Sequence, residues 1–142
     1  TRRSSDLGLI TPDLIVYEAS SWLEISDQLD LDRVFLATPS SSQERVDRTV
    51  EVSKGFVYAV STMGITGARE DLDKKARSVV EKVRAADASQ NVAVGIGIST
   101  ASQVSEVNSY ADGAIVGSVF VRAYASGGLP GLKQVTQELS SK

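Results

Sequence analysis

The 142-residue chain has 42% hydrophobic and 23% charged residues, which is typical of one soluble domain, and its net charge of −3 argues against a nucleic-acid groove. It contains neither Cys nor His, so a disulfide framework, a zinc–thiolate site, a cysteine nucleophile and a histidine base are excluded. No apolar run approaches the roughly 18 residues of a membrane span, and the first ten residues lack a signal-peptide core, so we expect a cytoplasmic protein without membrane contact.

Five short apolar runs predict β-strands. They span residues 7–14, 33–39, 56–62, 92–97 and 113–118. Their apolar character is nearly continuous rather than alternating, as in strands that are buried on both faces. The runs therefore favour a parallel sheet.

The segments between these runs have the spacing of amphipathic helices. One predicted face combines Ala19, Trp22, Leu23, Ser26 and Leu29, and another combines Leu72, Ala76, Val79, Val80 and Val83. We interpret both faces as core. Helix starts are predicted at Ser40 or Ser41, and at Thr100, which has Gln103 three residues later as a capping box requires. Residues 126–142 are expected to form a loop and a last amphipathic helix.

The alternation of strand and helix predicts a single α/β domain over residues 1–142, with a parallel sheet and right-handed crossovers. No Pro/Gly-rich linker separates the five units. In parallel sheets and barrels alike, ligands bind where the carboxyl ends of the strands meet. The strand exits are therefore the place to look for a site.

Three of the five exits carry glycine beside Ser or Thr. They contain Gly64 and Gly67, Gly95 and Gly97, and Gly117 and Ser118. Glycine packs no side chain, so such loops can present bare backbone N–H groups, and the last two run into helix N-termini that favour an anion. We predict a phosphate site; the alternative is three tight turns without a ligand. A dinucleotide fold is less well supported, because no loop has the G-x-G-x-x-G spacing.

Two further residues lie near predicted strand ends. Tyr58 belongs to the third run, and its pattern fits a core residue as well as one that lines a pocket. Asp13 follows "LITP", where a carboxylate is poorly explained as core, although an Asx turn or a helix cap also accounts for it. No second carboxylate accompanies Asp13 at another strand exit.

From about Gly8 to the C-terminus, the sequence resembles the α subunit of tryptophan synthase in its actinobacterial form. The resemblance rests on "GLITPDLIVYEASSWL", "DRVFLATPSSSQERV", "GFVYAVSTMGITGAR", "VGIGIST" and "YADGAIVGSVFVRA". It implies a (β/α)8 TIM barrel that splits indole-3-glycerol phosphate into indole and glyceraldehyde 3-phosphate. It also implies an α2β2 complex with a β subunit that carries pyridoxal phosphate, and no cofactor or metal in this chain.

The resemblance also implies roles for single residues. The family's phosphate-binding positions fall on Gly67, Gly97, Gly117 and Ser118. Its substrate pocket or mobile lid corresponds to Tyr58, Gly64, Thr66, Gly95, Ile96 and Asp13. Among these, Ile96 replaces a phenylalanine that some members carry, and Asp13 matches an aspartate of the active-site rim that is neither the catalytic acid nor the base.

This chain corresponds to only the last five of the family's eight strands, and residues 1–6 match poorly. The family's catalytic glutamate and aspartate lie in the part without a counterpart here, so no catalytic residue is expected in this chain. We therefore expect a lyase subunit represented by its phosphate-binding half. The alternatives are a non-catalytic phosphate-binding half-barrel and another barrel enzyme acting on a phosphosugar. Because five strands leave two bare sheet edges, self-association of the chain is also expected.

Overall fold

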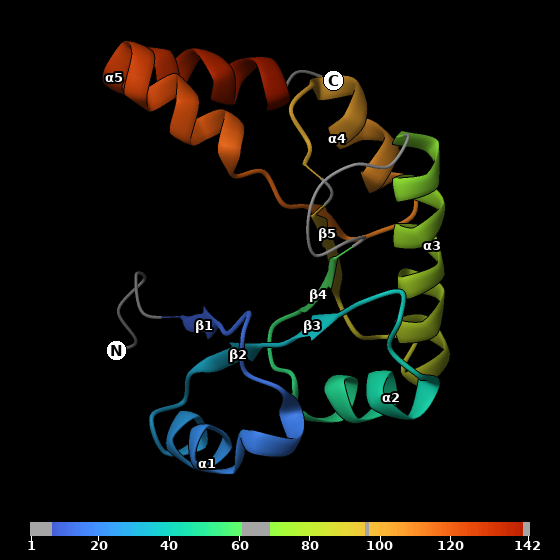
Figure 1. Cartoon of the computed structure of the whole chain (residues 1–142). Coiled ribbons are helices and arrows are strands. Elements are labelled where there is room, and N and C mark those ends of the chain that lie inside the picture. Colours follow the sequence, from blue (N-terminus) through green and yellow to red (C-terminus); the bar gives the residue numbers. More distant parts are fainter. Residues whose placement is uncertain (1–6, 61–68, 96, 141–142) are drawn as a thin grey trace.

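The structure is a computed structural model, which describes residues 7–60, 69–95 and 97–140, without the side chains of 69–72 (Figure 1). Its strands are β1 (Gly8–Ile10), β2 (Asp32–Val34), β3 (Leu36–Ala37), β4 (Val57–Val60), β5 (Val92–Gly95) and β6 (Gly113–Ala114). Its helices are η1 (Val16–Glu18), α1 (Ser20–Gln28), α2 (Gln43–Val52), α3 (Arg69–Ala86), α4 (Ala101–Asn108) and α5 (Ser118–Ser140). Within the described ranges, no helix is long and apolar enough to cross a membrane.

All strand pairs that the structure describes are parallel. β1 pairs with β2, and the second sheet has the order β3-β4-β5-β6. Only Phe35 separates β2 from β3, so the two are parts of one strand that passes from the first sheet to the second. A strand lies within, or overlaps, each of the five predicted runs, although each is shorter than its run. The architecture is that of a partial α/β barrel.

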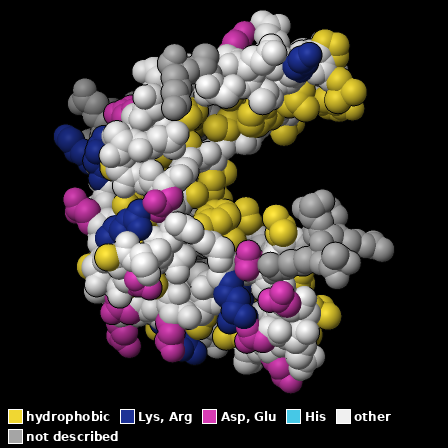
Figure 2. All heavy atoms as spheres, turned by 180° about the vertical axis from the view of Figure 1, so that it is seen from behind, with side chains coloured by type: hydrophobic (Ala, Val, Ile, Leu, Met, Phe, Trp, Pro, Cys, Tyr) yellow, Lys and Arg dark blue, Asp and Glu magenta, His cyan; other side chains and the backbone are white. Residues whose placement is uncertain are grey.

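The inner face of the second sheet is only half-buried. Tyr58 and Val60 of β4, and Ala93 and Gly95 of β5, are partly exposed, whereas their neighbours along each strand are buried. Figure 2 shows a hollow between the arm formed by α5 and the region of β1, with hydrophobic side chains along the side of the arm that faces it. The prediction of burial on both faces is therefore wrong for these strands, because the described chain covers the inner face only in part.

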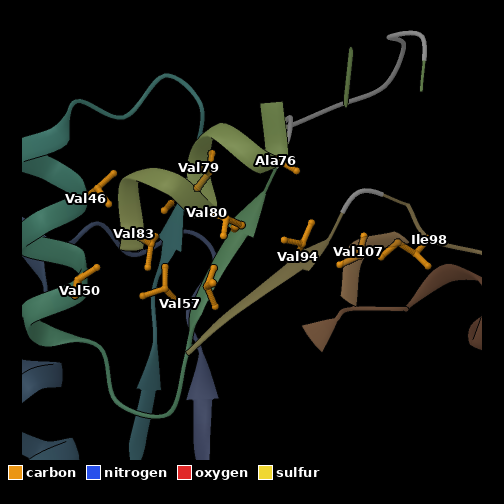
Figure 3. Close-up of a cluster of buried hydrophobic side chains, with 13 residues drawn as sticks. Val46, Val50, Val57, Ala76, Val79, Val80, Val83, Val94, Ile98 and Val107 are labelled. Atoms are coloured by element: carbon orange, nitrogen blue, oxygen red, sulfur yellow. The ribbon is translucent and has the colours of Figure 1, made fainter. Parts of the chain in front are cut away.

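The outer face of the sheet carries the main core (Figure 3). Val57 and Ala59 of β4 and Val92 and Val94 of β5 point toward the helices and are fully buried. The helices contribute Val46 and Val50 of α2, Ala76, Val79, Val80 and Val83 of α3, and Val107 of α4. The predicted face of α3 is thus confirmed for its four described side chains. Most of the apolar surface removed from water lies here, which makes this layer the principal source of stability.

A smaller core joins α1 to the first sheet. Ala19, Phe35 and Val52 are buried there, and Trp22 packs against them. Leu29, predicted on the same face, is 63% exposed, because α1 ends at Gln28 and Leu29 is its C-cap residue. That prediction is wrong, since the chain leaves the helix before the side chain can turn inward.

The buried guanidinium of Arg33, in β2, connects α1 and α2 through hydrogen bonds beside this smaller core. Its Nε donates to the carbonyl of Val52 over 2.6 Å, and Nη1 donates to Ser26 Oγ over 2.8 Å and to Asp27 over 2.7 Å. Lys54 also pairs with the carboxylate of Asp27. Because buried cations must be paired and hydrogen-bonded, these contacts explain how β2 carries an arginine inside the fold.

The C-terminal helix is sharply bent. Gly128 has φ 59° and ψ −149°, which is not helical, and Pro130 follows it. Beyond the bend the chain folds back, and a Cβ at Gly131 would lie 2.6 Å from the carbonyl oxygen of Ala123. The two halves of α5 thus approach each other closely at Gly131. The sequence predicted a loop and a last helix within residues 126–142, and the break at Gly128 with the helix after it agrees with this, although the loop is shorter and α5 already begins at Ser118.

Candidate functional site

The exits of β4, β5 and β6 lie side by side, because the register pairs Val60 with Gly95 and Val94 with Ala114. Two of these exits are described beyond the strand ends. Gly97 follows β5 and leads into α4, and Gly117 follows β6 and leads into α5. The structure therefore brings together two of the glycine loops that the sequence singled out.

Gly97 is exposed and has φ 73°, a conformation that favours glycine. A Cβ there would have no heavy atom of the described residues within 4 Å, so these residues leave space open above the backbone. The predicted capping box of α4 is confirmed: Thr100 Oγ1 accepts from the N–H of Gln103, and Gln103 Oε1 accepts from Thr100 and from Ser99. Since three backbone N–H groups, those of Ser99, Thr100 and Gln103, are used in this way, an anion would meet the remaining ones near Gly97 and in the first turn of α4.

Gly117 lies at the exit of the neighbouring strand, β6, directly before α5. It is exposed, and its carbonyl accepts from the N–H groups of Phe120 and Val121. Among the residues that the structure describes, no heavy atom would lie within 4 Å of a Cβ at Gly117. Ser118 is exposed and is the first residue of α5. The N–H groups of a helix start carry partial positive charge, so this position favours an anion.

Gly95 is surrounded differently. A Cβ there would lie 2.3 Å from the hydroxyl oxygen of Tyr58 and 2.6 Å from a ring carbon, so only glycine leaves room for this ring. The Tyr58 side chain is partly buried on the inner face, and burial raises its pKa. The sequence argument assigned both Gly95 and Gly97 to phosphate approach, whereas the packing of Tyr58 by itself accounts for Gly95.

Asp13 is exposed in the turn after β1, at a different exit from Gly97 and Gly117. Gly64, Thr66, Gly67 and Ile96 lie outside the described residues. The structure thus groups Gly97 with Gly117 and Ser118, and Tyr58 with Gly95. It leaves Asp13 apart from both groups.

Sequence reasoning missed a set of polar residues at the exits of β1 and β3. Thr38, Ser41 and Arg45 lie on one wall of a cavity of about 250 Å³ between η1 and α2. The signal that could have found them is the group of four hydroxyl residues that follows a strand directly: Thr38, Ser40, Ser41 and Ser42. This loop contains no glycine, so the glycine pattern of the other exits does not mark it.

Comparison with known proteins identifies relatives over nearly the whole chain. Residues 3–141 match the family profile described as tryptophan synthase alpha chain. The tryptophan synthase alpha chain of Leifsonia xyli subsp. xyli is 55% identical over 133 residues, which are 94% of this chain and 51% of that protein. That of Mycobacterium marinum is 50% identical over 134 residues, with 94% and 49% covered. This chain therefore spans about half the length of the curated relatives it matches.

Solved structures also match nearly the whole of this chain, which again corresponds to about half of their length. Mycobacterium tuberculosis tryptophan synthase superposes with a TM-score of 0.84 at 50% identity, covering 94% of this chain and 50% of that one. The tryptophan synthase α2β2 complex of Pyrococcus furiosus superposes with a TM-score of 0.78 at 32% identity, covering 94% and 54%. The partial barrel described above is thus similar to about half of each of these chains.

Proposed function

Since the chain belongs to the tryptophan synthase alpha chain family, we propose that it forms the phosphate-binding part of a lyase that cleaves indole-3-glycerol phosphate. The products are indole and glyceraldehyde 3-phosphate. The observation that carries this proposal is the open space above Gly97 and Gly117, on neighbouring strand exits that each lead into a helix N-terminus.

The phosphate is held by backbone N–H groups near Gly97 and Gly117 and by the Ser118 hydroxyl. Gly67, at the exit of the preceding strand, is the fourth phosphate-binding residue in this proposal. No Lys or Arg occurs between Gly95 and Ser118, so the helix N-termini supply the positive potential in these loops. Glycine is favoured at these positions because a side chain would occupy the space that the phosphate needs.

Tyr58 forms one wall of the pocket for the indole ring. Its own ring lies on the inner face, against the backbone of Gly95, and offers an apolar surface beside the phosphate loops. Because burial raises the pKa of Tyr58, its hydroxyl stays protonated at neutral pH. The ring therefore positions substrate without adding a charge.

The cleavage itself is a retro-aldol reaction, which needs an acid to protonate the indole ring carbon and a base to remove a glycerol hydroxyl proton. Two carboxylates with different pKa values can fill both roles. Asp13 is exposed at a distant exit and has no such partner among the described strand exits. In this proposal the catalytic pair belongs to the part of the barrel that has no counterpart in this chain.

Calorimetry with glycerol 3-phosphate tests the site. Gly97→Ala and Gly117→Ala should each weaken binding by about 1–3 kcal/mol, the cost of leaving a buried donor or acceptor unpaired. Gly113→Ala is the control, because a Cβ there meets only Ala93 at 3.7 Å, an ordinary contact. Equal affinity for the parent chain and all three variants would contradict the proposed site.

The partner in this proposal is a β subunit that carries pyridoxal phosphate, in an α2β2 assembly. The related structure from Pyrococcus furiosus is that of an α2β2 complex, which supports this assembly. The lack of a carboxylate pair at the described exits favours one second candidate, a non-catalytic phosphate-binding half-barrel. Indole release when the first three strand–helix units of the family are added in trans would distinguish the lyase from this alternative.

A further inference from the structure

The cavity of about 250 Å³ between η1 and α2 opens at the exits of β1 and β3. It is separate from the loops of Gly97 and Gly117. One wall is apolar, with Leu14, Ile15 and Val16 from the chain after β1 and Phe35 from the strand junction. The opposite wall is polar, with Thr38, Ser41, Arg45 and Thr49. A ligand that fits both walls must have an apolar part and a polar part.

The polar wall carries positive charge that nothing in the cavity neutralises. Arg45 is exposed, and its guanidinium has no ion pair or hydrogen bond with any residue in the described ranges. The residues that line the cavity include no Asp or Glu. Thr38 Oγ1 lies 3.0 Å from Ser40 Oγ and 3.1 Å from Ser41 Oγ, so hydroxyl groups gather beside the cation. Arginine with clustered hydroxyls is a typical arrangement for binding a carboxylate.

Hydrogen bonds to Lys82 of α3 hold the loop that carries these hydroxyl groups in place. Lys82 Nζ donates to the carbonyl oxygens of Ser41 over 2.7 Å and of Pro39 over 3.2 Å. In return, Gln43 Nε2 donates to the carbonyl of Lys82 over 3.0 Å. A loop that is held in this way loses little conformational entropy when a ligand binds.

The apolar wall has large side chains that protrude at its edge. Ile15 is 44% exposed and Tyr17 is 60% exposed, although both line the cavity. An aromatic ring placed against them would remove apolar surface from water on both sides of the contact.

We propose that this cavity binds a small aromatic carboxylate, with its ring against Ile15 and Tyr17 and its carboxylate at Arg45 and the hydroxyls of Thr38 and Ser41. At about 250 Å³ the cavity is slightly smaller than the roughly 300 Å³ at which sites for drug-sized molecules begin, so only a small ligand fits it. This inference does not depend on the phosphate site, since none of its residues belongs to the loops of Gly97 or Gly117.

Saturation-transfer NMR with benzoate tests the proposal, because it is read from the ligand and works for a monomer or an assembly. Arg45→Gln should weaken benzoate binding about tenfold, as expected for the loss of one charge-assisted contact. Arg48→Gln is the matched control: Arg48 lies on the same helix, is exposed, and does not line the cavity. Benzyl alcohol, which has the ring without the charge, should bind both variants equally.

A second variant tests the apolar wall. Ile15→Ala, at an exposed position, should weaken benzoate and benzyl alcohol alike. The proposal is overturned if benzoate does not bind, or if Arg45→Gln and Arg48→Gln reduce binding equally, which would indicate general surface charge. Benzoate binding should persist in Gly117→Ala, so failure of the phosphate site and failure of this one remain distinguishable.

Discussion

Gly95 and Gly97 are two residues apart, yet their surroundings give them different roles. A Cβ at Gly95 would overlap the Tyr58 ring, whereas a Cβ at Gly97 would meet open space. Gly97 instead needs glycine for its backbone, with φ 73°. The pair thus combines a packing requirement with a conformational one, and substitutions at the two positions should have different consequences.

Gly95→Ala should destabilise the chain by about 1–3 kcal/mol, the usual cost of overpacking, because the Tyr58 ring has to move. Adding Tyr58→Leu removes the three atoms nearest to the new Cβ and should recover part of this loss. Urea unfolding of both single variants and the double variant measures the coupling. If the two losses simply add, the contact between Tyr58 and residue 95 does not determine stability.

Asp27 should make stability depend on pH in the acid range. Lys54 and Arg33 hold the pKa of this carboxyl below its usual value of 3.8. The pKa of Asp27 is lower in the folded state than in the unfolded state. The stabilisation of the fold by the ionised carboxyl is therefore complete at pH values above the unfolded-state pKa, and it is lost as the pH falls through the folded-state pKa. Urea midpoints measured from pH 5 downward should fall less steeply in Asp27→Asn. The exposed Glu44, replaced by Gln, serves as the control.

At the scale of elements, local patterns predicted most of what the structure shows. Apolar runs placed all five strands, because a buried strand needs such residues wherever it lies. Thr100 and Gln103 predicted the start of α4, since in a capping box the side chain of each residue accepts a hydrogen bond from the backbone N–H of the other. Helical spacing predicted the buried face of α3. In each case the deciding interactions are local or depend only on burial.

The errors at this scale arise where distant residues decide. α2 begins after Ser42, whose Oγ accepts from the N–H of Arg45, and not after Ser40 or Ser41. Three consecutive serines offer equivalent caps, and Lys82, about forty residues away, fixes the loop through the carbonyls of Pro39 and Ser41. The role of Gly95 was missed for the same reason, because its partner Tyr58 comes from another strand.

Lys82 should therefore stabilise the junction of β3 and α2. Lys82→Met keeps most of the aliphatic stem but removes both bonds to the loop, and we expect a loss of about 1–3 kcal/mol. Hydrogen exchange should accelerate at the amide of Ser41, which bonds to the carbonyl of Thr38. Lys74→Met, at an exposed position of the same helix, is the control. Unchanged exchange in Lys82→Met would contradict this role.

At the scale of the whole molecule, the inner face and the α5 arm leave much apolar surface in water. Val121, Tyr124 and Leu129 of α5 are 70%, 57% and 71% exposed, and Leu9 of β1 is 55% exposed. Within the described chain, β1 and β6 each have only one neighbouring strand. Bare parallel edges beside exposed apolar side chains favour association with other chains.

The 142-residue chain on its own should accordingly self-associate and release no indole from indole-3-glycerol phosphate. Light scattering of the purified chain checks the first point and indole detection the second. Replacing Tyr124 and Leu129 by Ser should reduce the assembly, while Arg122→Gln, on the same helix, should not. A stable monomer that produces indole unaided would contradict both expectations.

The order of the strands also bears on how the chain acquires its fold. Each strand pairs with the next one along the sequence, as Gly8 does with Asp32 and Ala93 with Gly113. The partners in each pairing, such as Val57 and Val92, are about 20 to 35 residues apart, and the entropy cost of closing a loop rises only slowly with its length. During translation, each strand–helix unit can therefore settle as soon as the following strand has emerged from the ribosome, and no pairing described here has to wait for the C-terminus.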